Sequence, residues 1–271
     1  MRESNLGTGF RDVDRAQDPT RLVSYLDATS ALASIQAYKR QSFELLGLRP
    51  GTRVLEVGCG TGEDARAMAE LVAPDGLVVA LDSAETMVQQ ARERCAGLPV
   101  ECRVGDVHAL DFVDGSFDAV RADRVLQHVA DPIRAFAELV RVVRPGGRVY
   151  ALDPDWDTLV VDGGERGVTR RVTMHRTDRV RNGWMGRQLA GLAGDAGLVD
   201  LAVHTGHAIL PDLPLADRIL GLSAAAESAV ETGLISADEA REWLGALDRA
   251  HKARRFFSAL TAFSVVGTRP S

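Results

Sequence analysis

The chain has 271 residues, of which 45% are apolar, and a formal net charge of −6. A chain of this length buries one large core, or a core with a smaller cap. It contains no run of 18 apolar residues, and residues 1–10 lack the apolar stretch of a signal peptide. We therefore expect a cytoplasmic protein without a membrane partner. The acidic balance argues against nucleic acid as the main partner.

Strands and helices alternate between residues 53 and 153. The intervening helices include one with Ser83 as its expected N-cap and one that starts at Asp131 and Pro132 and ends at residues 144–147. Such alternation, with right-handed crossovers, is typical of a parallel α/β sheet. Short β-branched or apolar runs predict strands at 53–58, 76–82, 99–106, 116–122 and 147–153.

The regular alternation stops after residue 153. Residues 157–187 predict a loop and an arginine-rich helix, and two amphipathic helices follow between residues 212 and 251. The second of these opens with a capping box, Ser236 with Glu239. The first carries the apolar stripe Leu215, Ile219, Leu222, Ala226 and Val230.

We expect one domain, 1–271, built from two sets of segments. A helix near residue 38 should lead into the sheet, and Tyr25 and Tyr38 are expected either to pack in the core or to reach a bound ligand. The core is expected from about 48–156, 184–210 and 257–271, and the helical cap from 1–47, 157–183 and 212–251.

Three glycines, Gly58, Gly60 and Gly62, lie between the first strand and the first helix. A loop of this kind lets a ligand approach the backbone closely. A P-loop is excluded because no Lys-Ser or Lys-Thr follows the glycines. A dinucleotide loop is disfavoured because its phosphates would face Glu63 and Asp64 at the helix start. The pattern therefore predicts a ligand that is not anionic at this end, which argues against NAD.

Carboxylates recur where successive predicted strands end, at Glu56, Asp82 and Asp106. Ligands bind at the carboxyl ends of the strands in doubly wound sheets, so we expect these three side chains to line one crevice. A helix cap is the alternative role for any single aspartate.

The segment Glu56-Val57-Gly58-Cys59-Gly60-Thr61-Gly62 resembles motif I, E-x-G-x-G-x-G, of the class I S-adenosylmethionine-dependent methyltransferases. Residues 115–132 and 141–156 resemble the branch that contains ubiquinone and menaquinone C-methyltransferases and many natural-product methyltransferases. The resemblance is best over residues 48–156. It implies a Rossmann-like, doubly wound seven-stranded sheet whose last strand is antiparallel, with S-adenosylmethionine as the cofactor.

In the resembled family, the positions that match Asp82 and Asp106 accept hydrogen bonds from the ribose hydroxyls and the adenine amine. Ser83, Met87 and Val107 would flank the ribose and adenine. The expected cofactor-binding residues are Glu56, Gly58, Gly60, Gly62, Asp82, Ser83, Met87, Asp106, Val107, Ala122 and Asp123, the last two near the methionine part.

Methyl transfer from a sulfonium depends chiefly on positioning, and a base is needed only where the acceptor must lose a proton. The candidate catalytic residues are His128 and Asp153, which have a structural role and a loop-capping role as alternatives. We see no convincing metal ligand set and expect no metal. The candidate substrate-pocket residues are Asp155, Trp156, His175, Arg179 and Trp184.

Seven arginines lie between residues 165 and 187, against only Glu165 and Asp178. They either recognise a carboxylate or phosphate of the substrate, or form a solvated helix surface. Trp184 either stacks on a planar substrate or packs in the core.

The sequence therefore predicts methyl transfer to an O, N or C atom of a small organic acceptor, in specialised metabolism such as antibiotic biosynthesis. The sequence leaves open whether the acceptor is anionic and whether the protein forms a homodimer. The alternatives are a quinone-type C-methyltransferase and a protein that binds the cofactor without transferring methyl. The sequence does not identify the acceptor, because substrate choice depends on the shape of the cap.

Overall fold

The computed structural model describes residue 14 and residues 19–271. Within these residues an eight-stranded sheet has the order β3-β2-β1-β4-β5-β8-β6, and β7 pairs with β8 outside this path. Strands β1 to β5 are parallel, whereas β8 is antiparallel to β5, β6 and β7. The strands are β1 (Arg53–Val57), β2 (Leu77–Asp82), β3 (Val100–Val104), β4 (Phe117–Asp123), β5 (Val143–Pro154), β6 (Val160–Asp162), β7 (Val199–Leu210) and β8 (Phe257–Thr268).

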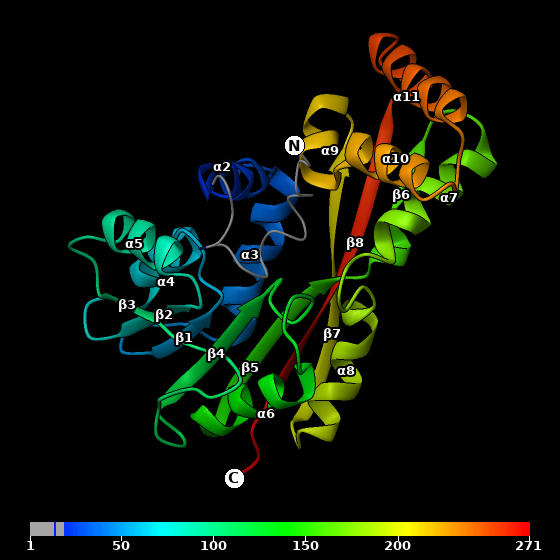
Figure 1. Cartoon of the computed structure of the whole chain (residues 1–271). Coiled ribbons are helices and arrows are strands. Elements are labelled where there is room, and N and C mark those ends of the chain that lie inside the picture. The colour runs from blue at the N-terminus through cyan, green and yellow to red at the C-terminus, as the bar shows by residue number, and fades with distance from the viewer. Residues whose placement is uncertain (1–13, 15–18) are drawn as a thin grey trace.

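Helices cover both faces of the sheet (Figure 1). One apolar cluster joins the sheet to α6 (Pro132–Val142) and α8 (Met185–Asp195), and another joins it to α3 (Ala33–Leu46) and α4 (Glu63–Val72). The central strands are largely buried, and β2 is apolar from Leu77 to Leu81, as parallel strands usually are, whereas β1 and β4 carry the buried charged residues Glu56 and Arg121. Helix α5 (Glu85–Arg94) packs against β2 and β3.

A second group of helices surrounds its own apolar cluster, which contains two buried tryptophans, Trp156 and Trp243. Figure 1 shows β8 running from the sheet up into this group. We call it the cap group; it consists of α7 (Arg166–Thr177), α9 (Leu213–Leu220), α10 (Leu222–Glu231) and α11 (Ala237–Lys252), with the short 3₁₀ helix η2 (Trp156–Thr158) beneath it.

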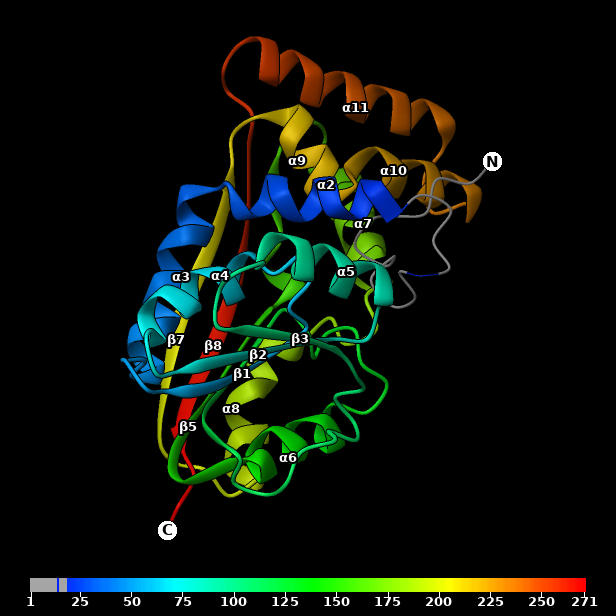
Figure 2. The same cartoon turned by 90° about the vertical axis from the view of Figure 1, so that its left-hand side faces the viewer.

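Helix α2 (Pro19–Ser30) connects the cap group with the sheet. It contacts α9, and Asp27 pairs with Arg94 of α5 at 2.8 Å. Figure 2 shows α2 crossing the molecule with α9 and α10 above it and α4 and α5 below. No helix within residues 19–271 is long and apolar enough to span a membrane.

The parallel α/β sheet with an antiparallel last strand is confirmed, but its strand number is wrong. The sequence predicts seven strands, and the described chain has an eighth, β6, which pairs with β8 through only three residues. The segment 144–147, expected to end a helix, instead lies inside β5, because α6 already ends at Val142.

Two predicted helix boundaries also differ. Ser83 does not cap α5: its N-cap is Ala84, and the Asp14 carboxylate accepts hydrogen bonds from the first backbone N–H groups, those of Glu85 and Thr86, at 2.9 and 3.0 Å. The single helix expected from Leu215 onwards is broken at Gly221 into α9 and α10. The capping box at Ser236 and the caps at Asp131 are confirmed.

Candidate active site

A cavity of about 600 Å³ lies at the carboxyl ends of β1 to β4. In the strand order, β1 and β4 are neighbours whose connections leave in opposite directions, and ligands bind in the crevice at such a switch point. The size suits a small-molecule ligand, since such pockets usually measure about 300–1,000 Å³. Its wall includes the glycine loop, the ends of β2 and β3, residues 123–130 after β4, and side chains of α2 and α3.

The glycine loop follows β1 and keeps its glycines for steric reasons. Gly58 has a φ of 69°, and a Cβ atom there would lie 2.4 Å from Val125 Cγ2. Gly62 has a φ of 84°, and its Cβ would lie 3.0 Å from Ala91 of α5. A residue with a side chain would therefore both strain the backbone and push the neighbouring elements away from the loop.

Asp82 ends β2 and supports the same loop. Its carboxylate accepts hydrogen bonds from Gly60 N–H at 2.9 Å and Ala84 N–H at 3.0 Å. Burial raises the pKa of Asp82 above its ordinary value, although the backbone N–H groups of Ala84, Gly60 and Ser83 oppose this. Asp82 therefore positions the loop while it also lines the cavity.

Asp106 follows β3 and is much more exposed. It accepts hydrogen bonds from the backbone N–H of His108 at 2.9 Å and from the His108 ring at 2.6 Å. His108 Nε2 accepts from Asp131 N–H, so Nδ1 carries the proton and donates to Asp106. Burial acts to raise the pKa of Asp106, but the hydrogen bonds from His108 outweigh it and hold that pKa below its ordinary value.

Arg121 lies fully buried in the middle of β4 and joins three carboxylates. Its guanidinium donates to Glu56 at 2.7 Å, to Asp64 at 3.0 Å and to Asp123 at 2.7 Å. The Nε group donates to Ser42 of α3 at 3.0 Å. Burial alone would lower the pKa of Arg121, but the surrounding carboxyl groups, first those of Asp64 and Asp123, raise it above its ordinary value. We call this arrangement the Arg121 network.

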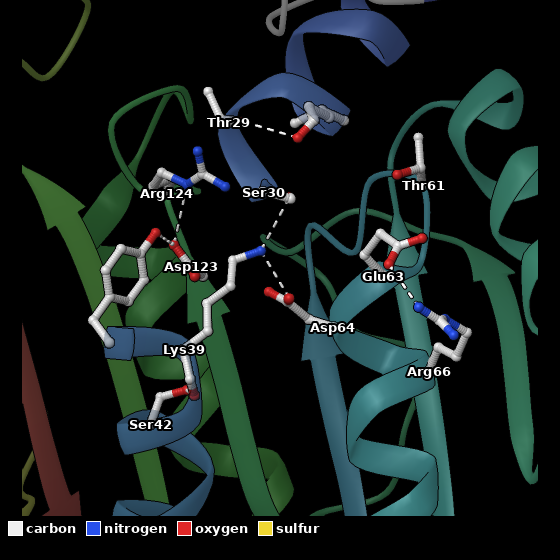
Figure 3. A network of polar contacts seen from close by, with 12 residues as sticks. Thr29, Ser30, Lys39, Ser42, Thr61, Glu63, Asp64, Arg66, Asp123 and Arg124 are labelled. Carbon is white, nitrogen blue, oxygen red and sulfur yellow. Dashed lines mark hydrogen bonds and ion pairs between the residues drawn. The ribbon is translucent and has the colours of Figure 1, made fainter. Parts of the chain in front are cut away.

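Helix α3 adds a second cation to the Arg121 network. Lys39 is 7% exposed and pairs with Asp64 at 2.7 Å, and it also donates to Ser30 at 3.3 Å (Figure 3). At the end of β4, Arg124 pairs with Asp123 at 3.2 Å (Figure 3). Burial alone would raise the pKa of Asp64, but the positive charges of Arg121 and Lys39 outweigh this effect and lower the pKa below its ordinary value.

These contacts change the sequence argument about the acidic helix start. Asp64 is paired with Arg121 and Lys39, and Glu63 with Arg66 at 3.1 Å (Figure 3). The two carboxylates are therefore compensated and do not present the unopposed negative charge that the sequence argument assumed.

Glu56 is the carboxylate of the Arg121 network with unused capacity. It is 2% exposed and lines the cavity, and its Oε2 atom has no hydrogen-bond partner among the described residues. Burial raises the pKa of Glu56 to about 8, against the opposing charge of Arg121. A ligand with a cationic N–H donor would satisfy this oxygen.

The segment after β4 is held by buried hydrogen bonds. Asp153 is 1% exposed and accepts from the N–H groups of Leu126 and Gln127 at 3.1 and 3.3 Å. The Asn182 side chain donates to Leu126 O at 2.7 Å. Burial holds the pKa of Asp153 well above its ordinary value. Asp153 is absent from the described residues that line the cavity, so the geometry gives it the loop-capping role rather than a catalytic one.

His128 lines the cavity and lies on this rigid segment, with Arg181 donating to its carbonyl at 3.0 Å. Trp156 also lines the cavity, and its Nε1 donates to the Gln127 side chain at 2.7 Å. These side chains form the wall between the sheet and the cap group.

The other predicted substrate-pocket residues do not meet there. Asp155 is 1% exposed and ion-paired to Arg187, and the Trp184 Nε1 atom donates to Asp157 at 2.7 Å. His175 lies 3.1 Å from the Ser228 hydroxyl of α10. None of Asp155, His175, Arg179 and Trp184 is among the described residues that line the cavity.

The predicted cofactor residues meet in one place, with two exceptions. Gly62 and Ala122 are not among the described lining residues. Gly62 faces Ala91 of α5, and Ala122 is buried in β4. Tyr25 lines the cavity, whereas the Tyr38 hydroxyl bonds to Asp123 at 3.5 Å. The nine that line it are Glu56, Gly58, Gly60, Asp82, Ser83, Met87, Asp106, Val107 and Asp123.

Sequence reasoning missed several lining residues. Lys39 comes from a segment that carries no recognisable motif. Arg124 and Gln127 lie within residues 115–132, whose resemblance did not single them out, and Arg181 is one of several arginines in the arginine-rich segment. One signal was available for Arg121, since a lone charge inside an apolar strand needs a buried partner.

Comparison with known proteins decides the family. Residues 55–151 match the family described as a methyltransferase domain. The demethylmenaquinone methyltransferase of Bacillus cereus is 32% identical over 140 residues, which is 49% of this chain and 59% of that enzyme. This chain belongs to the class I S-adenosylmethionine-dependent methyltransferases. Its cofactor is therefore S-adenosylmethionine.

Two further similarities extend over more of this methyltransferase. An uncharacterised 37.1 kDa protein in a transposon of Streptomyces fradiae is 45% identical over 246 residues, covering 90% of this chain and 70% of that protein. Phosphoethanolamine N-methyltransferase 2 of Haemonchus contortus, solved in complex with S-adenosylmethionine, shares the fold with a TM-score of 0.59 and 22% identity. That comparison covers 97% of this chain and 60% of the Haemonchus protein.

The cavity fits this cofactor by its donor and acceptor chemistry. The unpartnered Glu56 Oε2 suits an ammonium, and the strand-end carboxylates of Asp82 and Asp106 suit a diol and an exocyclic amine.

Proposed function

We propose that this methyltransferase transfers the methyl group of S-adenosylmethionine to an O, N or C atom of a small organic acceptor. The observation that supports this most is the cavity at the β1–β4 switch point, where the glycine loop, Glu56, Asp82 and Asp106 line one wall. The opposite wall, near Trp156 and His128, is shared with the cap group and is where we place the acceptor.

We assign the strand-end carboxylates to the parts of the cofactor that carry matching donors. Asp82 accepts from the ribose hydroxyls, and Asp106, oriented by His108, accepts from the adenine amine. Glu56 receives the ammonium of the methionine part, and Lys39 and Arg124 supply positive charge for its carboxylate.

The bound cofactor supplies an electrophilic methyl group on a sulfonium. The residues of the chain position the acceptor for in-line displacement, which can account for ~7–11 kcal/mol of the barrier in favourable systems. His128 is placed to take a proton where the acceptor is a hydroxyl or an ammonium. For an acceptor that needs no deprotonation, His128 has a structural role, and substitution there should have a small effect.

We place the acceptor in specialised metabolism, on the similarity of residues 115–132 and 141–156 to natural-product methyltransferases. A cytoplasmic location and a homodimer are part of the same proposal. The quinone-type C-methyltransferase is the second candidate, favoured by the 32% identity to the Bacillus cereus enzyme. An apolar quinol that is methylated while small polar acceptors are not would establish the second candidate instead.

The test is S-adenosylhomocysteine formation by the purified full chain with a panel of phenols, amines, carboxylic acids and a short-chain demethylquinol. We expect turnover with at least one acceptor. In Asp82→Ala, we expect turnover at limiting cofactor to fall at least about tenfold, because charge-assisted hydrogen bonds of about 1.5–3 kcal/mol each are lost.

The matched control is Asp75→Ala, an exposed aspartate beyond the end of α4, which should behave like the unchanged protein. Tight binding of S-adenosylmethionine without turnover on any acceptor would contradict methyl transfer and favour a protein that only binds the cofactor.

A further inference from the structure

Arg176 differs from the other arginines of the segment 165–187. It is 1% exposed, whereas Arg166, Arg170 and Arg179 are exposed. Its Nε group donates to Leu220 O at 2.8 Å, at the C-terminal end of α9. Its guanidinium carbon lies 4.4 Å from the centre of the Trp156 ring, a cation–π contact.

The two terminal nitrogens of Arg176 have no hydrogen-bond acceptor. Both Nη1 and Nη2 are buried and unpartnered among the described residues. Burial lowers the pKa of Arg176 to about 10, so the group still carries its charge at neutral pH. An unpaired buried charge is costly, and buried charges normally have a partner. The tie to Leu220 uses only one of the five N–H donors of a guanidinium.

Arg176 is not among the described residues that line the cavity, but it contacts one that is, Trp156, on the acceptor side. The Trp156 ring that it contacts also lines the cavity, beside Gln127 and His128. Tyr25, another lining residue, is close enough to act on the pKa of Arg176. Helix α7, which carries Arg176, packs against η2 and α10, so these side chains lie where the sheet meets the cap group.

We propose that the two terminal nitrogens of Arg176, which lie beside Trp156 and next to the cavity, bind a carboxylate of the methyl acceptor that enters past this ring. This inference rests on the proposed function and names its substrate class: small acceptors with one carboxylate and a planar or apolar body. The planar body would lie against Trp156.

The chemistry favours a monoanion over a phosphate. The guanidinium fork presents two parallel N–H donors that match the two oxygens of a carboxylate. The neighbouring His175 adds no charge, because burial and Arg179 lower its pKa. A single positive charge balances one negative charge, and a dianion would leave a second charge buried without a partner.

The experiment measures binding of carboxylate probes to the full chain saturated with S-adenosylhomocysteine. The probes are formate, which fits any carboxylate site, and benzoate, with formamide and benzamide as their uncharged counterparts. Binding is followed by calorimetry and by the rise in unfolding temperature that a ligand of the folded state produces. The variants are Arg176→Met and Arg176→Lys, with Arg170→Met as the matched control on the exposed face of α7.

We expect the carboxylates to bind and the amides not to. Arg176→Met should weaken benzoate binding by about tenfold or more. Arg176→Lys keeps the charge but loses the two parallel N–H donors, so its benzoate affinity should lie between those of the unchanged protein and Arg176→Met. Arg170→Met should match the unchanged protein. Should Arg176→Met fail to fold, the carboxylate preference and Arg176→Lys still decide the question.

The inference is overturned if the unchanged protein does not prefer carboxylates to amides, or if the Arg176 variants bind benzoate as well as it does. Binding of S-adenosylhomocysteine itself separates the two levels. If it binds and the carboxylates do not, only the role of Arg176 fails; if it does not bind, the proposed function fails.

Discussion

Arg121 shows most clearly how single residues build this site. A guanidinium in the middle of a buried strand is tolerated because Glu56, Asp64 and Asp123 surround it, each from a different element or strand end. The charge of Arg121 therefore links three elements: β1, which leads into the glycine loop, α4, which follows that loop, and β4. Removing one member of such a buried network typically costs about 3–5 kcal/mol.

Glu56 gives the pH prediction at this scale. Its folded-state pKa is raised to about 8, so at pH 7 the free protein holds the proton. The ammonium of the cofactor favours the carboxylate form, so binding should release a proton and the affinity should rise as pH increases from about 6 to about 8. Calorimetry at pH 7 in two buffers of different ionisation enthalpy measures this release.

The control for the proton release is Glu56→Gln, which cannot titrate and should lose the buffer dependence. Equal heats in the two buffers with the unchanged protein would contradict the assignment of Glu56. The same raised pKa has a consequence for folding. The contribution of Glu56 to stability is fully present below its unfolded pKa near 4.5 and is lost as pH rises through about 8.

At the scale of elements, the sequence predicts where a helix or strand lies better than where it begins and ends. The stripe Leu215, Ile219, Leu222, Ala226 and Val230 keeps helical spacing across Gly221, so periodicity gives no sign of a break. Gly221 nevertheless has a φ of 68° and serves both as the C-cap of α9 and as the N-cap of α10. The glycine itself was the available signal, since it is the usual residue at a helix C-terminus.

Gly221→Ala tests this break. An L-residue in the left-handed region costs roughly 1–2 kcal/mol, so the free energy of unfolding should fall by about that amount in urea denaturation. Gly191→Ala is the matched control: it lies inside α8 with open space around its Cβ, and the exchange should leave stability unchanged or raise it by up to ~1 kcal/mol. Equal effects of the two exchanges would contradict the assigned role of Gly221.

At the scale of the whole molecule, the sequence predicted the residues on the sheet side of the cavity but not those on the side of the cap group. The ends of parallel strands meet at one edge of a sheet, so a motif and two strand-end aspartates were enough to predict one wall. The side chains of Lys39, Arg124 and Arg181 reach the cavity from segments far apart in the chain, and only the packing of these segments brings them together. The same packing places Asp155, His175 and Trp184 outside the cavity lining, where they contact Arg187, Ser228 and Asp157 respectively.

We propose that the cap group sets what the methyltransferase accepts. It has its own apolar cluster and meets the sheet at η2, so the acceptor side of the cavity depends on the orientation of α2, α7 and α9. The carboxylate assignment at Arg176 and the wall at Trp156 and His128 belong to this level.

The most direct measurement of the central claim is titration calorimetry of the purified full chain with S-adenosylmethionine, S-adenosylhomocysteine and NAD in turn. The account predicts micromolar binding of the first two and no binding of NAD, because the wall offers carboxylates to a ribose, an amine and an ammonium. Binding of NAD alone would contradict the account, since the glycine loop would then hold a pyrophosphate rather than a sulfonium cofactor.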